Sequence, residues 1–152
     1  MTKRIFRAVC ISAVTVLCAS IILVMGVLYG YFNDVRKNQI KAELSLAKNA
    51  VETEGVSYLE NLKNESTDYR ITWIDKSGNI IFDTQSNSES MENHLEREEV
   101  KEAFANGSGE SERYSSTLTE KMMYCAELLD DGTVLRISVS QLTVLTLLLG
   151  IA

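Results

Sequence analysis

The stretch RITWIDKSGNIIFD, residues 70–83, decides much of the fold, because it predicts two short strands joined by a tight turn. Its β-branched and aromatic residues favour strands, and the Gly and Asn of KSGN favour the turn. Three more strands are predicted in ERYSSTL (112–118), MMYCAEL (122–128) and TVLRISV (133–139). The DDG segment before the last of these signals another hairpin.

Two helices are predicted around these strands. Apolar residues recur at nearly heptad spacing between Asp34 and Lys63, which indicates a long helix with one apolar stripe. A shorter helix is predicted from Glu96 to Asn106, with Gly107 placed to end it. The simplest architecture is an α+β fold, with a five-stranded antiparallel sheet, helices on one side of it and a long N-terminal helix.

No charged residue occurs from Ala8 to Asn33. A helix of this length exceeds the ~30 Å hydrocarbon core of a bilayer, so the segment predicts a transmembrane helix in contact with membrane lipid. A cleaved signal peptide is the alternative, but the run is too long and lacks an A-x-A site. Because Lys3, Arg4 and Arg7 precede the run, the N-terminus is expected in the cytoplasm and the following residues outside.

The segment LTVLTLLLGIA, Leu142 to Ala152, is almost wholly apolar. At about 16 Å as a helix it is too short to cross a bilayer, so it is interpreted as the start of a second, truncated transmembrane helix. The alternative is a buried terminal strand or helix.

Residues 34–136 carry all 21 acidic and 12 of the 15 basic residues, a net charge of −9. This balance argues against nucleic acid or anionic lipid as a partner of this region, since both select a basic surface. Small ligands, cations and proteins remain. The three cysteines cannot form a disulfide framework within one chain, although an intermolecular bridge through Cys125 stays open.

His94 is the only histidine, and it opens the acidic helix segment HLEREE. A histidine followed by Glu and later by Pro would suggest a phospho-acceptor, but this chain has no proline and no glycine-rich ATP motif. Nearby carboxylates leave cation sensing as a minor alternative. We expect His94 to cap or pack, and we predict no catalytic, cofactor-binding or metal-ligating residue in this chain.

The ordered set RITWIDKSGNIIFDT, MENHLEREEVKEAFANGSGES, RYSSTL and DDGTVLRISVS resembles the extracytoplasmic PAS-like (Cache-type) sensor domain of bacterial two-component sensor histidine kinases, in particular the phosphate-regulon type. The resemblance covers about Ile71 to Ser140. The matching positions are Trp73, Ile74, Asp75, Gly78, Phe82 and Asp83, then Asn93, His94, Arg97, Glu99 and Val100, then Gly132, Val134, Leu135 and Arg136.

The resemblance implies a signal-sensing and transmembrane-signalling role in the bacterial plasma membrane, with ATP, Mg²⁺ and a cognate response regulator needed only by a kinase core that this chain lacks. The implied layout is a cytoplasmic N-terminus (1–7), a first span (8–33), a membrane-proximal helix (34–64), the sensor domain (65–140) and the second span (141–152). Alternatives are the sensor region of a chemoreceptor or cyclic-dinucleotide enzyme, or a standalone anchored binding module.

Two sets of residues are candidate sites. Strand aromatic residues could line a pocket for an unknown small ligand, although such residues more often belong to a core. These are Trp73, Phe82, Tyr114 and Tyr124. The apolar stripe of the long helix could form the seam of a parallel homodimer, or could pack on its own domain. Its positions are Ile40, Leu44, Ala47 and Val51.

Overall fold

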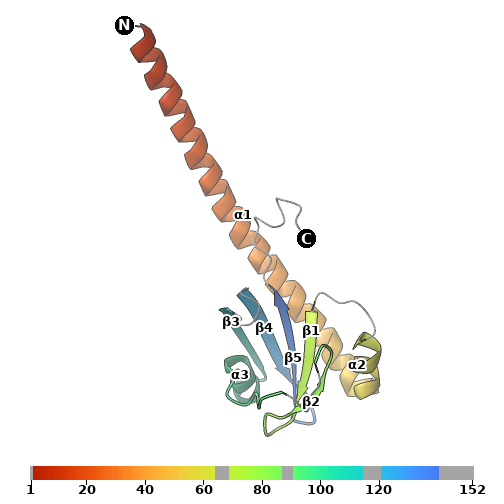
Figure 1. The fold of residues 1–152 in the computed structure, drawn as a ribbon. Helices are drawn as coiled ribbons and strands as arrows, with labels where there is room; N and C mark the ends of the chain where they lie inside the picture. The colour runs from red at the N-terminus through yellow and green to blue at the C-terminus, as the bar shows by residue number, and fades with distance from the viewer. Residues whose placement is uncertain (1, 64–68, 87–90, 115–120, 141–152) are drawn as a thin grey trace. The chain divides into compact units, whose positions relative to one another are not determined.

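The computed structural model describes residues 2–63, 69–86, 91–114 and 121–140 (Figure 1). The chain divides into two compact units, Met1–Arg36 and Lys37–Ala152. Helix α1, Thr2–Glu54, contributes to both units. The predicted second span, residues 141–152, lies outside the described residues.

The first unit contains the uncharged apolar segment, whose large side chains are exposed. Ile22 and Leu23, for example, are 72% and 68% exposed. Within the residues that the structure describes, α1 is the one helix long and apolar enough to cross a membrane. The helical state of residues 8–33 is therefore as predicted.

The second unit is built on a five-stranded antiparallel sheet with strand order β2-β1-β5-β4-β3. The strands are β1 Tyr69–Ile74, β2 Ile80–Asp83, β3 Ser108–Tyr114, β4 Lys121–Leu128 and β5 Val134–Ser140. The α+β class, the long N-terminal helix and the antiparallel sheet are confirmed. The prediction placed the third strand too late, because Gly107 ends the preceding helix in the left-handed region (φ 88°) and lets the strand begin directly after it.

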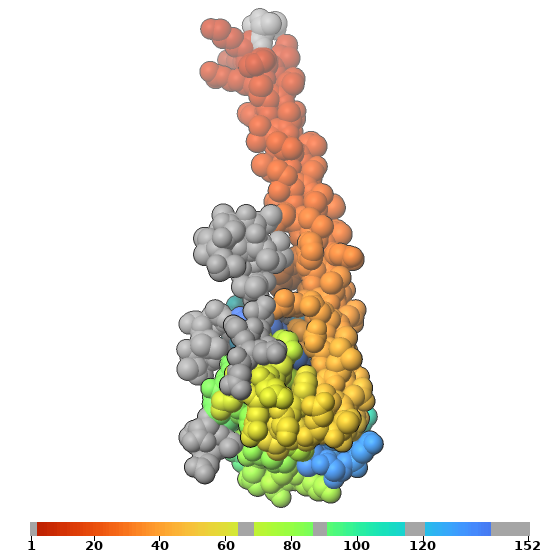
Figure 2. Space-filling view, turned by 90° about the vertical axis from the view of Figure 1, so that its right-hand side faces the viewer, coloured from red at the N-terminus to blue at the C-terminus, as the bar shows by residue number. Residues whose placement is uncertain are grey.

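Helices cover both faces of the sheet (Figure 1), so the prediction of helices on one side is wrong. Helix α1 and the short helix α2, Val56–Lys63, contribute to the core on one face, and α2 also lies at the surface (Figure 2). Helix α3, Glu98–Asn106, packs on the other face through Val100 and Ala103 against Ala126 and Val134. The strands offer apolar side chains alternately to both faces, and each apolar area is covered by a helix.

The proposed dimer seam is corrected by the structure. Ile40, Leu44, Ala47 and Val51 are 5%, 1%, 2% and 3% exposed, and they belong to the core between α1 and the sheet. The apolar stripe is therefore covered by the chain's own strands and does not offer a seam to a second copy. The alternative stated above, a helix packed on its own domain, is the arrangement found.

Polar contacts fix α1 along the sheet. Lys37 and Lys41 both form ion pairs with Glu110 of β3, and Lys48 Nζ donates to the carbonyl oxygen of Leu128 at 2.8 Å. The ion pairs with Glu110 raise the pKa of Lys37. These contacts join the N-terminal helix to the two strands at one edge of the sheet.

Candidate functional site

The face of the sheet that carries α3 is apolar only in part. Beyond the contact with Val100 and Ala103, the side chains on this face are polar and several are buried. Thr72, Arg136 and Ser138 are 0%, 4% and 4% exposed. Buried polar groups are costly unless they are paired, so their partners define what this face can do.

Glu99 lies at the centre of this polar region and is fully buried. Its Oε2 accepts hydrogen bonds from Ser111 Oγ (2.6 Å) and Arg113 Nη1 (2.7 Å), and its Oε1 accepts from Arg113 Nη2 (3.1 Å) and Arg136 Nη1 (3.4 Å). Burial alone would raise the pKa of Glu99, but the hydrogen bonds from Arg113 and Ser111 outweigh it and lower the pKa to about 2. Glu99 is therefore a carboxylate at neutral pH.

Asp83 holds a second carboxylate on the same face. Both of its oxygens accept from Arg70 Nε, at 3.0 and 2.9 Å, and Oδ2 also accepts from Thr72 Oγ1 at 2.8 Å. Thr72 Oγ1 in turn accepts from Arg136 Nη2 at 3.2 Å. Arg136 therefore links the two carboxylate groups into one arginine–carboxylate network, which consists of Arg70, Thr72, Asp83, Glu99, Ser111, Arg113 and Arg136.

Arg136 is the least satisfied member of the network. Its two hydrogen bonds are the longest ones described above, and its Nε has no partner although it is buried. Burial lowers the pKa of Arg136, and the charge of Glu99 only partly opposes this. The ring of Tyr124 stacks beneath the guanidinium groups, with its centroid 3.8 Å from Arg113 Cζ and 5.4 Å from Arg136 Cζ.

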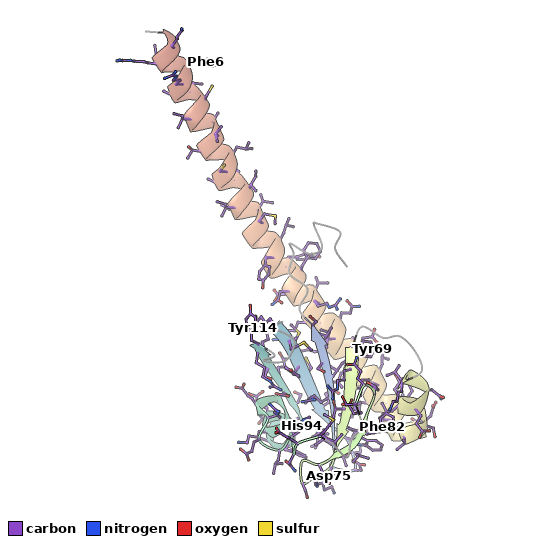
Figure 3. The ribbon with its side chains drawn as sticks, in the orientation of Figure 1. Phe6, Tyr69, Asp75, Phe82, His94 and Tyr114 are labelled. Carbon is purple, nitrogen blue, oxygen red and sulfur yellow. The ribbon has the colours of Figure 1, made fainter. Side chains whose placement is uncertain are left out.

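His94 lies in the segment before α3 (Figure 3). Its backbone N–H donates to the carbonyl oxygen of Gly78 at 2.8 Å, and its side chain is 5% exposed with an unpartnered Nδ1. Burial, and then the positive charge of Arg136, lowers the pKa of His94 to about 4. The imidazole is therefore neutral at pH 7, and the expectation that it packs is confirmed.

The turn between β1 and β2 packs closely against the segment that contains His94. A Cβ built on Gly78 would lie 2.4 Å from Asn93 Oδ1 and 2.6 Å from the backbone nitrogen of Leu95, and the φ of Gly78 is +84°. Asn93 Nδ2 also donates to the carbonyl oxygen of Ser77 at 2.7 Å. Only glycine allows the segment before α3 to approach the turn so closely.

The four predicted pocket residues do not come together. Trp73 and Phe82 face the α1 side, where Trp73 Nε1 donates to Thr133 Oγ1 at 2.7 Å and the Phe82 ring lies 5.7 Å from Lys63 Nζ. Tyr114 is 74% exposed, and Figure 3 shows it far from Phe82, on the opposite edge strand. Tyr124 alone contacts the network, because alternation along β4 places it on the polar face.

The charged members of the network were not predicted as site residues from the sequence. Arg136 sits in the apolar strand TVLRISV, where a charge is unusual, and this was a signal that it has a buried partner. Glu99 was named only as a position that matches the sensor-domain pattern, within the acidic segment HLEREE. It shares a helix face with Val100 and Ala103, which marks it in retrospect as inward-facing.

Neither metal nor thiol chemistry is indicated by the described residues. They contain no group of three or more His, Cys, Asp or Glu side chains that could hold a metal ion. Cys125 is buried in the core under α1, and burial raises the pKa of its thiol to about 11. Because the Cys125 thiol is buried and stays protonated at neutral pH, it is poorly suited to form an intermolecular disulfide.

Comparison with known proteins shows no family for this chain. No family model matches the chain, and no curated protein matches it. Among solved structures, it is similar to the Bacillus subtilis YkuI protein, which has an EAL domain and was crystallised with its substrate c-di-GMP and calcium. The identity is 12%, the TM-score is 0.43, and the match covers 74% of this chain and 35% of that one, so this chain spans about a third of the length of YkuI.

Proposed function

We propose that the chain is the sensing and transmembrane-signalling part of a bacterial two-component sensor histidine kinase, and that residues 65–140 form its PAS-like (Cache-type) sensor domain. In this proposal residues 8–33 anchor the chain in the plasma membrane, residues 1–7 are cytoplasmic, and residues 34–140 are extracytoplasmic. The kinase core, with its ATP, Mg²⁺ and response regulator, belongs to a part that follows this chain.

The observation that supports the proposal most is the composition of α1. One helix, Thr2–Glu54, contains both the apolar segment and the residues Leu44 and Val51 of the sheet's core. The sheet therefore packs directly on the helix that carries the apolar segment. A change in how the sheet packs would bias the position of this helix, which is the kind of two-state element that signalling requires.

The arginine–carboxylate network supports a sensing role on the opposite face of the sheet. Strand β5 carries Arg136 on the network side and Leu135 and Ile137 on the α1 side. A displacement of β5 by a bound ligand would therefore reach α1 through side chains that are already in contact. The proposed signal path is network, β5, α1 and membrane.

The first experiment concerns the output. We expect the gene to encode, after codon 152, a dimerisation histidine and an ATP-binding domain, and the full-length protein in vesicles to form phosphohistidine with ATP and Mg²⁺. The 152-residue chain should form none. A downstream heptad-rich signalling hairpin, a cyclic-dinucleotide enzyme or a stop codon would each contradict the kinase proposal and indicate one of the alternatives.

The second experiment concerns topology. Glu98 is exposed on α3, so a cysteine there, in a background lacking the three native cysteines, should react with a membrane-impermeant maleimide in intact cells. A cysteine replacing Thr2 should react only after the cells are opened. The opposite pattern would place the sheet in the cytoplasm and remove the proposed orientation.

A parallel homodimer remains part of the proposal, but with a different helix face. Gln39, Ala42, Leu46 and Asn49 are exposed and follow the alternating spacing of three and four that a two-helix seam requires. Leu46 is 65% exposed in the chain. A membrane anchor would raise the effective concentration of copies, which favours pairing through this outer face.

A further inference from the structure

Tyr114, the last residue of β3, is the most exposed large hydrophobic side chain among the residues that the structure describes. Its exposed fraction is 74%, against 72% for Ile22 in the apolar segment of α1. A single exposed aromatic ring is ordinary on a protein surface, so its meaning depends on where it lies in the fold.

Strand β3 runs along α1 toward the N-terminal part of this helix. Beside the start of β3, the carbonyl oxygen of Leu128 accepts from Lys48 Nζ at 2.8 Å. Further along β3, Glu110 forms ion pairs with Lys37 and Lys41. The contacts with α1 therefore move back from residue 48 to residues 41 and 37 as the strand proceeds.

The direction of β3 places Tyr114 at one particular end of the sheet. Tyr114 lies four residues, about 13 Å, beyond Glu110 along the strand, and Figure 3 shows it at the end of the sheet opposite to Asp75. The uncharged apolar segment ends at Asn33, only four residues, about 6 Å, before Lys37 along the helix. When this segment lies in a bilayer, the end of the sheet with Tyr114 is therefore the end nearer to the membrane surface.

The last residues of the apolar segment indicate where that membrane surface would lie. Tyr29, Tyr31 and Phe32 are 46%, 63% and 50% exposed, and the ring centroids of Tyr31 and Phe32 are 5.8 Å apart. Aromatic side chains at the end of a span favour the headgroup region, where the ring is partly buried and its polar group stays hydrated. Tyr114 offers a side chain of the same type from the end of the sheet.

We propose that the end of the sheet at Tyr114 docks on the membrane surface, with the Tyr114 ring among the headgroups of zwitterionic phospholipids. The net charge of −9 in residues 34–136 opposes binding to anionic lipid, whereas insertion of a tyrosine ring needs no charge on the lipid. Docking would hold β3, and through Glu110 also α1, at a fixed distance from the bilayer. The inference rests on the proposed function, because it requires residues 8–33 to span the membrane.

The single tryptophan allows a direct test in the whole chain. In a Trp73→Phe background, three chains carry one tryptophan each, through Tyr114→Trp, Phe32→Trp or Ser77→Trp. Ser77 is exposed in the turn at the opposite end of the sheet, so Ser77→Trp is the control. Each chain is reconstituted in phosphatidylcholine vesicles, with and without phosphatidylcholine that carries bromine near the headgroup end of its acyl chains, which quenches a tryptophan that it contacts.

The expected result is a loss of fluorescence for Tyr114→Trp and Phe32→Trp and none for Ser77→Trp. If Phe32→Trp is quenched and Tyr114→Trp is not, the docking is wrong and the membrane anchor stands. A short emission wavelength without quenching at Tyr114→Trp would mean that protein covers this end, which also overturns the lipid contact. Equal quenching of all three chains overturns docking through one end of the sheet. If Phe32→Trp is not quenched, the anchor of the proposed function is wrong, and the docking falls with it.

A second measurement needs no change at Trp73, whose Nε1 donates to Thr133 and whose replacement could prevent folding. The ring signals of isotope-labelled tyrosines are recorded by NMR in phosphatidylcholine nanodiscs, and the Tyr114 signal is assigned by its loss in Tyr114→Phe. A lipid with gadolinium on its headgroup should broaden the signals of Tyr114, Tyr29 and Tyr31. A Tyr114 signal that stays sharp while those of Tyr29 and Tyr31 broaden overturns the docking and leaves the anchor intact.

Discussion

At the scale of single residues, Glu99 is the most consequential side chain of the network, because it is buried and joins α3 to two arginines. We predict that Glu99→Gln lowers the free energy of unfolding by about 3 kcal/mol, since it leaves Arg136 without a counter-charge in a buried site. Urea unfolding followed by the fluorescence of Trp73, the only tryptophan, measures this loss.

Glu98→Gln is the matched control for this prediction. Glu98 lies in the same first turn of α3 but is exposed, so the substitution should change the free energy of unfolding by less than about 0.5 kcal/mol. Equal effects of the two variants would mean that the helix dipole, and not the buried network, accounts for the loss.

His94 and Glu99 are expected to lower the stability of the fold in two separate ranges of acid pH. The pKa of His94 falls from 6.5 to about 4 on folding, so the stability that it contributes is present above pH 6.5 and is lost as the pH falls through 4. The pKa of Glu99 falls from 4.5 to about 2, so its contribution is lost only below pH 4.5. Urea midpoints measured from pH 7 downward should therefore decline in two stages.

His94→Gln should abolish the first stage, a loss of about 3 kcal/mol in the free energy of unfolding, and should keep the second stage. The variant then loses little stability between pH 6.5 and pH 4.5. A wild-type decline in this range that persists in His94→Gln would assign it to other groups.

At the scale of elements, the two faces of α1 have opposite roles, and one residue on each tests them. Leu44 is 1% exposed within the core, and Leu46, two positions later, is 65% exposed. Leu44→Ala should lower the free energy of unfolding by about 3 kcal/mol through lost contacts and a cavity. Leu46→Ala should stay within about 0.5 kcal/mol in the monomer. Similar losses would contradict the assignment of the two faces.

At the scale of the whole molecule, the outer face of α1 is expected to pair two chains in a membrane. In a background lacking the native cysteines, Leu46→Cys and Ala42→Cys should form disulfide-linked dimers on mild oxidation, because both positions are exposed on the proposed seam. Ser45→Cys is the control, since it is exposed but lies about 100° from Leu46 and about 60° from Ala42 around the helix. Crosslinking that is no greater at the seam than at position 45 would exclude the outer-face dimer.

Local sequence determined the elements of this protein. Residues 8–33 form a helix because they are apolar and contain no charge and no proline, and residues 70–83 form a hairpin because β-branched and aromatic runs flank a Gly-containing turn. A strand was also predicted at TVLRISV, and Val134–Ser140 form one. Such patterns report on each residue's own backbone and its immediate neighbours.

Only the tertiary structure decided which apolar and charged groups meet. The heptad stripe of α1 is equally suited to a second helix or to a sheet, and the packing of the chain's own strands on Leu44 and Val51 settled its use. Likewise, Arg113 and Arg136 are 14 and 37 positions from Glu99 in the sequence. Only the antiparallel pairing of β3, β4 and β5 brings the three residues together. Long-range burial, which changes both the pairing and the pKa of these groups, cannot be read from local spacing.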